Sequence, residues 1–413
     1  MTHKLVFKNT FYQILTKVIT SFSGFLITII IARGFGIEGF GDFTKITAFI
    51  GLFFLFVDFG LNAVFLKEER GDFKKLFYSR LILSFIIFVL ANFIAVFLPF
   101  NSSLGIGFSP FIRLGIFVYS FSLFTQAIIN STSASFQRNL NYKPYFISIA
   151  LGSIINLLMV IIFSLLGFSI LYIVFAFVLS ALVSGVAALF LVREKIFPVS
   201  FDLPYTKKIL VNSLPIGLML IFNLIYFRAD MLILSFLKPT ADVGIYGIAY
   251  KFFDFLIALP LFLSNSLYPF LILNKENPNK FFSLTKNYFV IFFVSSILII
   301  LPFWFLSPLF TLIKSEFSLA IVPFRILILS LPFFFLTSFL QWILISLEKQ
   351  KFLAVVYFSS TLLNLVLNII FIPQWSYLAS AVITGVCEGV VFLLLVYKTY
   401  SVKIFLEKEQ KNE

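Results

Sequence analysis

Two residue types that often carry chemistry are almost missing from this chain. Its single cysteine, Cys387, rules out an intrachain disulfide and a metal site built from cysteines, and its apolar surroundings are typical of an inert buried thiol. The single histidine, His3, lies at the N-terminus, which argues against membrane enzymes that need a histidine base or several histidine ligands. The sequence therefore predicts no metal site and no cofactor.

Charged residues are also scarce. They make up 12% of the chain, whereas hydrophobic residues make up 61% and the mean hydropathy is +1.06. A soluble domain is roughly half apolar and about a quarter charged, and an ordinary core does not absorb the difference. The composition indicates a protein that lies in a bilayer.

Apolar runs of membrane-spanning length recur along the whole chain. The first run is too long for a signal peptide and ends without a small-residue cleavage site, which favours a retained helix. Segments rich in Pro, Asn, Ser and Gly separate the runs. The sequence predicts an all-α integral membrane protein with spans at about 11–32, 43–66, 80–99, 111–131, 145–166, 169–192, 209–236, 245–273, 287–306, 323–347, 352–373 and 377–400.

The net charge of +13 is explained by basic residues that gather in the loops on one side of the membrane. With both termini in the cytoplasm, about 22 basic residues fall on the cytoplasmic side, and the other side holds four: Arg33, Arg113, Lys238 and Lys314. No zinc-finger spacing or aromatic RNA-binding strand accompanies the charge, so nucleic acid is not an expected partner.

An internal repeat relates the two halves of the chain. "GFGDF" (Gly39–Phe43) and "DVGIY" (Asp242–Tyr246) stand 203 positions apart, and "SIINLLMVIIF" matches "TLLNLVLNIIF" at an offset of 208. Six predicted spans in each half give the halves the same orientation, as in transporters with parallel repeats. We expect two pseudo-symmetric six-helix bundles, 1–197 and 198–413, around a central cavity.

Several motifs resemble a known family. "ARGFGIEGFGDF", "VDFGLN" and "FRADMLILSFLKPTADVGIYGIAYKF" are similar to the Wzx-type polysaccharide transporters of the multidrug/oligosaccharidyl-lipid/polysaccharide exporter superfamily. "SFQRNLNYKPYF" and "NLVLNIIFIPQWSYLASAVITGVCEG" extend the resemblance over essentially the whole chain. Its most specific elements are the Arg-x-Asp of the seventh span and the Gly-Ile-Tyr and Ala-Tyr-Lys of the eighth.

The resemblance implies a flippase rather than an enzyme. Its cargo would be an undecaprenyl-pyrophosphate-linked oligosaccharide, moved by alternating access from the inner to the outer leaflet for surface polysaccharide assembly. The expected location is a bacterial or archaeal inner or plasma membrane. The expected partners are this lipid-linked oligosaccharide and membrane lipid, with a proton or sodium ion and other polysaccharide assembly proteins as further candidates.

Cationic residues near the spans are the candidates for substrate binding. A guanidinium is always charged and binds phosphate through two hydrogen bonds, which suits a diphosphate headgroup. For each cation a plainer explanation also stands: anchoring at the membrane interface, pairing with a nearby acid, or obedience to the sidedness rule. The predicted substrate-binding residues are Arg228, Lys251, Arg325, Arg138 and Arg80.

Acids and amides within the spans form two further groups of candidates. Intramembrane carboxylates serve as proton or sodium sites in transporters, so Asp58, Asp254 and Glu388 are predicted ion-coupling residues, with helix packing as the alternative role. Lys251 and Asp254 share a helix face and are expected to pair. The predicted structural polar residues, which hydrogen-bond between or along helices, are Asp230, Asn130, Gln126, Asn364 and Asn368.

Three other functions compete with the flippase. A multidrug exporter of the same superfamily would need a neutral or acidic cavity, whereas the candidate cavity helices carry arginine and lysine. A membrane glycan polymerase or ligase would need a large outer loop with paired catalytic residues, and the outer connectors here are short. A lipid scramblase or passive assembly scaffold would show no dependence on an ion gradient.

Overall fold

The computed structural model describes residues 3–68, 71–274 and 278–412, and packing divides them into two units. The N-terminal unit runs to Leu224 and includes Pro239–Gly244, and the C-terminal unit holds Ile225–Lys238 and everything from Ile245 onward. The predicted boundary after residue 197 falls in the linker before helix α8 (Leu203–Leu237). Residues of α8 up to Leu224 belong to the N-terminal unit, and the residues from Ile225 onward belong to the C-terminal unit.

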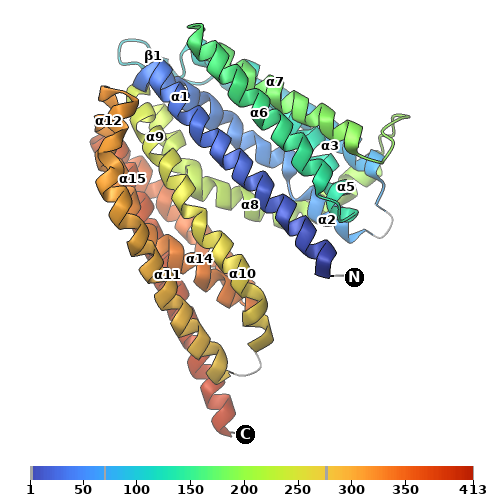
Figure 1. Ribbon diagram of the computed structural model, residues 1–413, viewed down its shortest axis with the longest axis vertical. Coiled ribbons are helices and arrows are strands. Elements are labelled where there is room, and N and C mark those ends of the chain that lie inside the picture. Colours follow the sequence, from blue (N-terminus) through green and yellow to red (C-terminus); the bar gives the residue numbers. More distant parts are fainter. Residues whose placement is uncertain (1–2, 69–70, 275–277, 413) are drawn as a thin grey trace. The chain divides into compact units, whose positions relative to one another are not determined.

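The N-terminal unit is a helical bundle in which α6 packs against both α1 and α7 (Figure 1). The only strands among its described residues form a two-residue antiparallel hairpin, with Phe100 opposite Gly107. Its elements are α1 (His3–Asp58), α2 (Leu61–Lys67), α3 (Phe73–Val96), β1 (Phe100–Asn101), β2 (Ile106–Gly107), α4 (Pro110–Ser120), α5 (Ser122–Arg138), α6 (Lys143–Leu165) and α7 (Ile170–Leu191).

Local sequence sets where these helices bend and begin. Gly36 has a φ of 68° and a ψ of −167°, which divides α1 into two helices at the glycine of "ARGFG". Helix α3 begins at Phe73 because the Asp72 side chain accepts hydrogen bonds from the Lys74 and Lys75 amides. It therefore starts seven residues before the predicted span at 80.

The C-terminal unit is a second bundle, in which α14 packs against α10, α11 and α15 (Figure 1). Its long α15 is divided by a kink at Ser376, three residues after Pro373. The remaining elements are α8 (Leu203–Leu237), α9 (Thr240–Ile257), α10 (Leu259–Asn274), α11 (Pro278–Leu306), a 3₁₀ turn (Ser307–Leu309), α12 (Phe310–Ile313), a 3₁₀ helix (Ser315–Ala320), α13 (Ile321–Leu329), α14 (Leu331–Ser346) and α15 (Gln350–Asn412).

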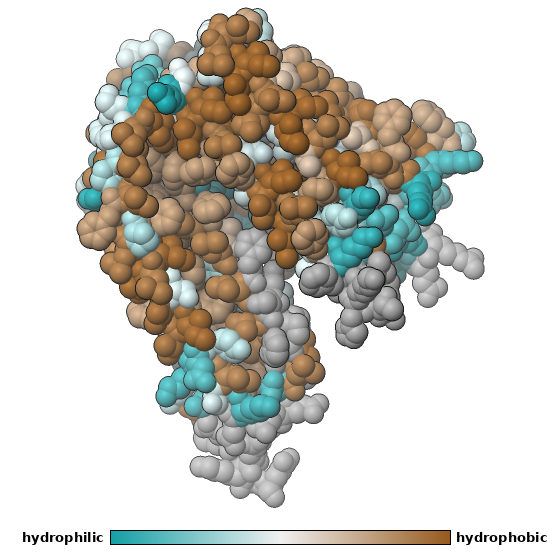
Figure 2. Space-filling view, in the orientation of Figure 1, coloured by the Kyte–Doolittle hydropathy of each residue, from teal (hydrophilic) through white to brown (hydrophobic). Residues whose placement is uncertain are grey.

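The described residues contain nine helical segments long and apolar enough to cross a membrane. Two of these, containing the kinks in α1 and α15, hold two crossings each, and α9 with α10 adds one more, which makes twelve crossings. Each predicted span has its counterpart. Hydrophobic side chains cover the lengths of the helices in view, and hydrophilic side chains gather near helix ends (Figure 2). The all-α membrane fold is confirmed.

The predicted 203-residue repeat reappears as a close helix crossing inside the N-terminal unit. A Cβ on Gly41 would lie 2.1 Å from the carbonyl oxygen of Thr240, and a Cβ on Gly244 would lie 2.0 Å from that of Ile37. Each glycine thus meets the residue four positions before the other glycine. Backbone atoms this close leave no room for a side chain, so both positions require glycine.

A buried lysine holds the same crossing. Lys45 is 0% exposed, and its Nζ donates to the Gly107 carbonyl at 2.7 Å and to the Thr240 hydroxyl at 2.9 Å. The Thr240 amide in turn donates to the carbonyl of Gly105, in the hairpin. The first turn of α9 is therefore fixed to the N-terminal unit by backbone contact and by a charged hydrogen bond.

Candidate substrate and ion sites

Arg228 is held from two directions within the C-terminal unit. Its Nη2 donates to Asp254 Oδ2 at 2.9 Å, joining α8 to α9. Its guanidinium carbon lies 5.3 Å from the centre of the Tyr250 ring, within cation–π range. The two charged side chains keep 35% and 25% of their surface exposed, so neither is fully buried in the unit.

Lys251 lies on α9 one residue after Tyr250, and its side chain is exposed. Among the described residues it makes no hydrogen bond or ion pair. The expected Lys251–Asp254 pair is not formed, because Arg228 from the neighbouring helix reaches Asp254 instead. This part of the C-terminal unit carries two cations against one partly exposed carboxylate.

Asp230 lies on the opposite side of α8 from Arg228, as its position two residues further on predicts. It is 2% exposed and accepts hydrogen bonds from the Tyr246 hydroxyl and, at 3.4 Å, from the Thr384 hydroxyl. The amide of Met231 donates to its other oxygen at 2.7 Å. Asp230 thus contacts two neighbouring helices, α9 and α15.

Glu388 is a second buried carboxylate of the C-terminal unit, also 2% exposed. The Tyr226 hydroxyl donates to its Oε2 at 2.6 Å, and the Thr337 hydroxyl donates to its Oε1. These contacts join α15 to α8 and α14. Both oxygens therefore have hydrogen-bond donors, which is how a carboxylate can lie in an apolar bundle.

The predicted amide pairs do form hydrogen bonds. Gln126 donates to Asn130 at 2.8 Å along α5, and Asn368 donates to Asn364 at 3.0 Å along α15. The Asn368 side-chain oxygen is buried and has no hydrogen-bond partner in the described part of the chain.

Arg80 is buried in the N-terminal unit instead of lying open at the helix ends. It is 0% exposed, and its three nitrogens donate to the Val57 carbonyl, the Ser131 hydroxyl and, at 2.8 Å, the Asn62 side-chain oxygen. Asp58, a predicted ion-coupling residue at the end of α1, lies within its electrostatic reach. The geometry gives Arg80 the task of joining α1, α2, α3 and α5.

Arg138 and Arg325 are held in a similar way. Arg138 donates to the carbonyls of Gly71 and Glu68 at 2.8 and 3.0 Å and lies 4.9 Å from the centre of the Phe65 ring. Arg325 donates to the Ser307 hydroxyl at 2.9 Å, and its guanidinium lies 4.8 Å from the centre of the Trp304 ring. Both side chains thus have local partners, and their binding role stays a prediction.

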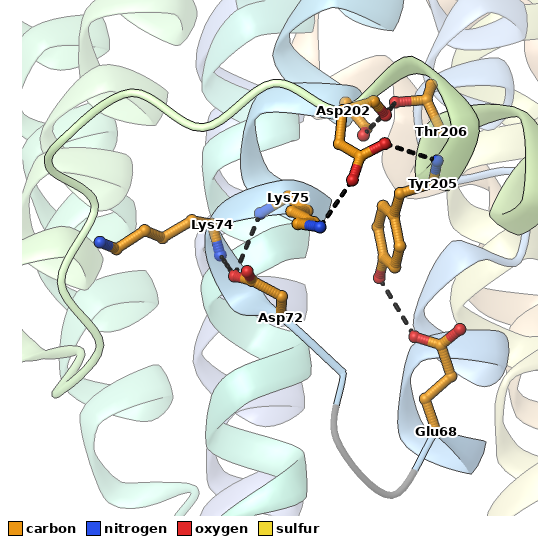
Figure 3. A network of polar contacts seen from close by, with 8 residues as sticks. Glu68, Asp72, Lys74, Lys75, Asp202, Tyr205 and Thr206 are labelled. Carbon is orange, nitrogen blue, oxygen red and sulfur yellow. Dashed lines mark hydrogen bonds and ion pairs between the residues drawn. The ribbon is translucent and has the colours of Figure 1, made fainter.

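A polar network at the start of α3 and α8 had no counterpart in the sequence expectations (Figure 3). Lys75 Nζ lies 2.6 Å from Asp202 Oδ2, and the Asp202 side chain also accepts from the Tyr205 amide at 3.0 Å. The Lys75 hydrogen bond, followed by that of the Tyr205 amide, lowers the pKa of Asp202 below its usual value. Nearby, Tyr205 and Lys208 both contact Glu68.

A pocket of about 360 Å³ opens beside this network in the N-terminal unit. Acidic, basic and aromatic residues share its wall, and one Glu194 oxygen is buried there with no hydrogen-bond partner among the described residues. The described residues contain no cluster of three or more His, Cys, Asp or Glu able to hold a metal ion. The pocket is lined by Phe65, Gly71, Asp72, Phe73, Lys74, Arg138, Asn139, Glu194 and Lys195.

Sequence reasoning missed the uncharged partners of these sites. Tyr226, Tyr246 and Tyr250 each contact a carboxylate or the Arg228 guanidinium, yet a tyrosine among so many aromatic residues carries no distinguishing signal. The spacing held a partial clue, because Tyr246 and Tyr250 are four residues apart and share a face of α9 with Lys251 and Asp254 close by.

Comparison with known families finds two family models that match the chain. A family model described as "Polysaccharide biosynthesis protein" matches residues 6–272, and a second model, MatE, matches residues 215–370. No curated protein sequence matches the chain.

Solved structures with the same fold are distant in sequence. The lipid II flippase MurJ, in an inward closed conformation, is 15% identical with a TM-score of 0.75, covering 95% of this chain and 87% of MurJ. An inward-facing multidrug resistance MATE family transporter is 15% identical with a TM-score of 0.73, covering 94% and 98%. A MOP superfamily transporter from Pyrococcus furiosus, described as having a binding pocket of reverse polarity, is 14% identical with a TM-score of 0.60, covering 97% and 96%.

Proposed function

Because the chain belongs to the polysaccharide biosynthesis protein family, we propose that it is a flippase for lipid-linked oligosaccharides. It would carry an undecaprenyl-diphosphate-linked repeat unit from the inner to the outer leaflet of the cytoplasmic membrane, where other assembly proteins would extend the polysaccharide. The charge distribution of the loops supports a topology with both termini in the cytoplasm. MurJ, which shares the fold, is itself described as a lipid flippase.

The arrangement of Arg228, Lys251 and Asp254 carries this proposal. A diphosphate headgroup needs cations that it can reach. Here a partly exposed arginine lies near an exposed lysine that has no ion pair with any described residue. Arginine suits phosphate because its planar fork donates two parallel hydrogen bonds, and lysine adds a flexible point charge. One carboxylate does not neutralise the two cations.

Transport would proceed by alternating access of the two repeats, with the headgroup in a hydrated cavity and the polyprenyl tail in lipid. A membrane potential that is negative inside favours outward movement of an anion by about 2.3 kcal/mol per charge per 100 mV. The buried carboxylate Glu388 is our candidate for cation coupling, together with Asp58 and Asp254. A proton or a sodium ion is the counter-transported species to test.

Purified protein in liposomes with a labelled lipid-linked oligosaccharide tests the proposal. Arg228→Ala and Lys251→Ala are each expected to slow flipping at least tenfold, because each removes a phosphate partner. Lys351→Ala is the matched control, since Lys351 is an exposed lysine of the same unit and has no ion pair among the described residues. Unchanged flipping in both Arg228→Ala and Lys251→Ala would refute the phosphate site.

A second candidate function is multidrug export. The MatE model matches residues 215–370, and the buried carboxylates Asp230 and Glu388 lie in or near that stretch of the C-terminal unit. An exporter of organic cations would raise the resistance of a drug-sensitive host when expressed, and this resistance would fall in Glu388→Gln. A flippase for an anionic lipid would leave drug resistance unchanged.

A further inference from the structure

The partners of Arg228 differ in how firmly they are held. Tyr250 is 2% exposed, and its hydroxyl donates to the Phe227 carbonyl at 2.9 Å, so its ring is fixed between α9 and α8. Asp254 contacts Arg228 through one oxygen only and keeps a quarter of its side chain exposed. The aromatic partner is therefore held in place by its own burial and hydrogen bond, whereas the carboxylate is the partner that can leave.

A second partner for Asp254 lies within reach. Lys251 stands three residues earlier on α9, so the two side chains share a helix face. Its ammonium group has three donors and no hydrogen bond or ion pair within the described part of the chain. A carboxylate that leaves Arg228 can turn to Lys251 without ever lacking a counter-ion, which avoids the cost of an unpaired charge near lipid.

We infer that Asp254 is a built-in counter-anion of the substrate site. It occupies the Arg228 guanidinium while no substrate is bound, and the diphosphate of the lipid-linked substrate displaces it toward Lys251. Tyr250 is a positioning residue that keeps the guanidinium in place during the exchange. The inference rests on the proposed function, because it takes Arg228 as the group that binds phosphate.

The exchange would adjust both capture and release. A diphosphate presents more charge and more acceptor oxygens than a single carboxylate, so it replaces Asp254 on entry. When the headgroup leaves, Asp254 returns to Arg228 and prevents rebinding. Such a competitor weakens equilibrium binding, and in return it speeds release, which often limits turnover in transporters and enzymes alike.

Binding of inorganic pyrophosphate to the purified full-length protein, followed by calorimetry, separates this inference from the proposed function. Asp254→Asn is expected to bind pyrophosphate about three- to tenfold more tightly than the wild type, and Asp254→Glu to bind like the wild type. In liposomes Asp254→Asn should flip the lipid-linked oligosaccharide more slowly, because release is delayed. If the asparagine variant does not fold, Asp254→Ser is judged by the same criterion.

The tyrosine has its own test in the same assay. Tyr250→Leu should weaken pyrophosphate binding several-fold, because the ring no longer holds the guanidinium. Tyr250→Phe keeps the ring and should bind within about twofold of the wild type. Tyr357→Phe, which removes the hydroxyl of another tyrosine of the unit that bonds Gln341, is the control for the loss of one hydroxyl.

Two results are decisive in opposite ways. A wild-type protein that does not bind pyrophosphate would contradict the anionic-headgroup site itself, and with it the proposed function. A wild type that binds pyrophosphate, together with an Asp254→Asn variant that binds equally or more weakly, would leave the proposed function standing and overturn the counter-anion role.

Discussion

The crossing of Gly41 and Gly244 allows a quantitative prediction about stability. An alanine Cβ at position 41 would lie 2.1 Å from the Thr240 carbonyl oxygen, and backbone on both sides leaves no flexible side chain to move away. Forcing an extra carbon into a packed site costs about 1–3 kcal/mol. The helices must separate by more than 1 Å to relieve the contact.

Separation would also affect the buried lysine. Lys45 bonds Thr240 at 2.9 Å, and stretching this charged hydrogen bond in a site with 0% exposure costs about 1.5–3 kcal/mol. Alanine regains at most about 1 kcal/mol of helix propensity over glycine. Gly41→Ala should therefore destabilise the protein by roughly 2–5 kcal/mol.

Thermal unfolding in detergent, followed by tryptophan fluorescence, measures this effect. Gly51→Ala is the matched control on the same helix, because a Cβ there meets nothing within 4 Å, and it should keep or slightly raise the midpoint. Gly244→Ala should lower the midpoint about as much as Gly41→Ala, and the double variant by less than the sum, because one separation relieves both contacts. A Gly41→Ala protein as stable as Gly51→Ala would refute the close crossing.

Three further predictions concern polar groups. Arg80→Met should cost about 3–5 kcal/mol in the same unfolding assay, because two buried acceptors and the half-buried Asn62 oxygen lose a charged donor. Glu388→Gln should cost about 1–3 kcal/mol, because an amide NH₂ would face a hydroxyl donor, and it should remove any proton or sodium dependence of flipping in liposomes. The pKa of Asp202 is lower in the folded protein than in the unfolded chain, so its ion pair with Lys75 stabilises the fold fully at pH values above the pKa of the unfolded chain. This stabilisation is lost as the pH falls through the pKa that Asp202 has in the folded protein. Pepsin should therefore cut the linker at 192–202 of the wild type faster as the pH falls below about 4. The reference is an Asp202→Asn protein, which lacks the ion pair and should be cut readily at every pH.

The span pattern was readable from the sequence because a bilayer imposes one simple requirement. Every crossing needs about 20 apolar residues with its backbone bonded internally, and loops carry the charge. The residues at which helices begin and end were harder to predict from the sequence. Helix α3 begins at Phe73, ahead of the predicted span, because the cap by Asp72 and the buried partners of Arg80 make a polar first part of the helix stable.

The candidate sites show which part of the chemistry the sequence left undetermined. The Arg-x-Asp spacing predicted that Arg228 and Asp230 face different ways, and they do. The partner of Asp254 was predicted wrongly. The side chain of Arg228 reaches Asp254 from the neighbouring helix, and this contact forms in place of a pair with Lys251 on the same helix. No periodicity indicates that the Tyr226 and Thr337 hydroxyls converge on Glu388, since this depends on how three helices pack.

The most direct test of the account compares two lipids in the same liposomes: one oligosaccharide on a polyprenyl diphosphate, and the same oligosaccharide on an uncharged polyprenyl anchor. Wild-type protein should flip the diphosphate lipid at least tenfold faster, and Arg228→Ala should abolish this preference. Equal rates for the two lipids in the wild type, or a preference for the uncharged one, would contradict the recognition of an anionic headgroup.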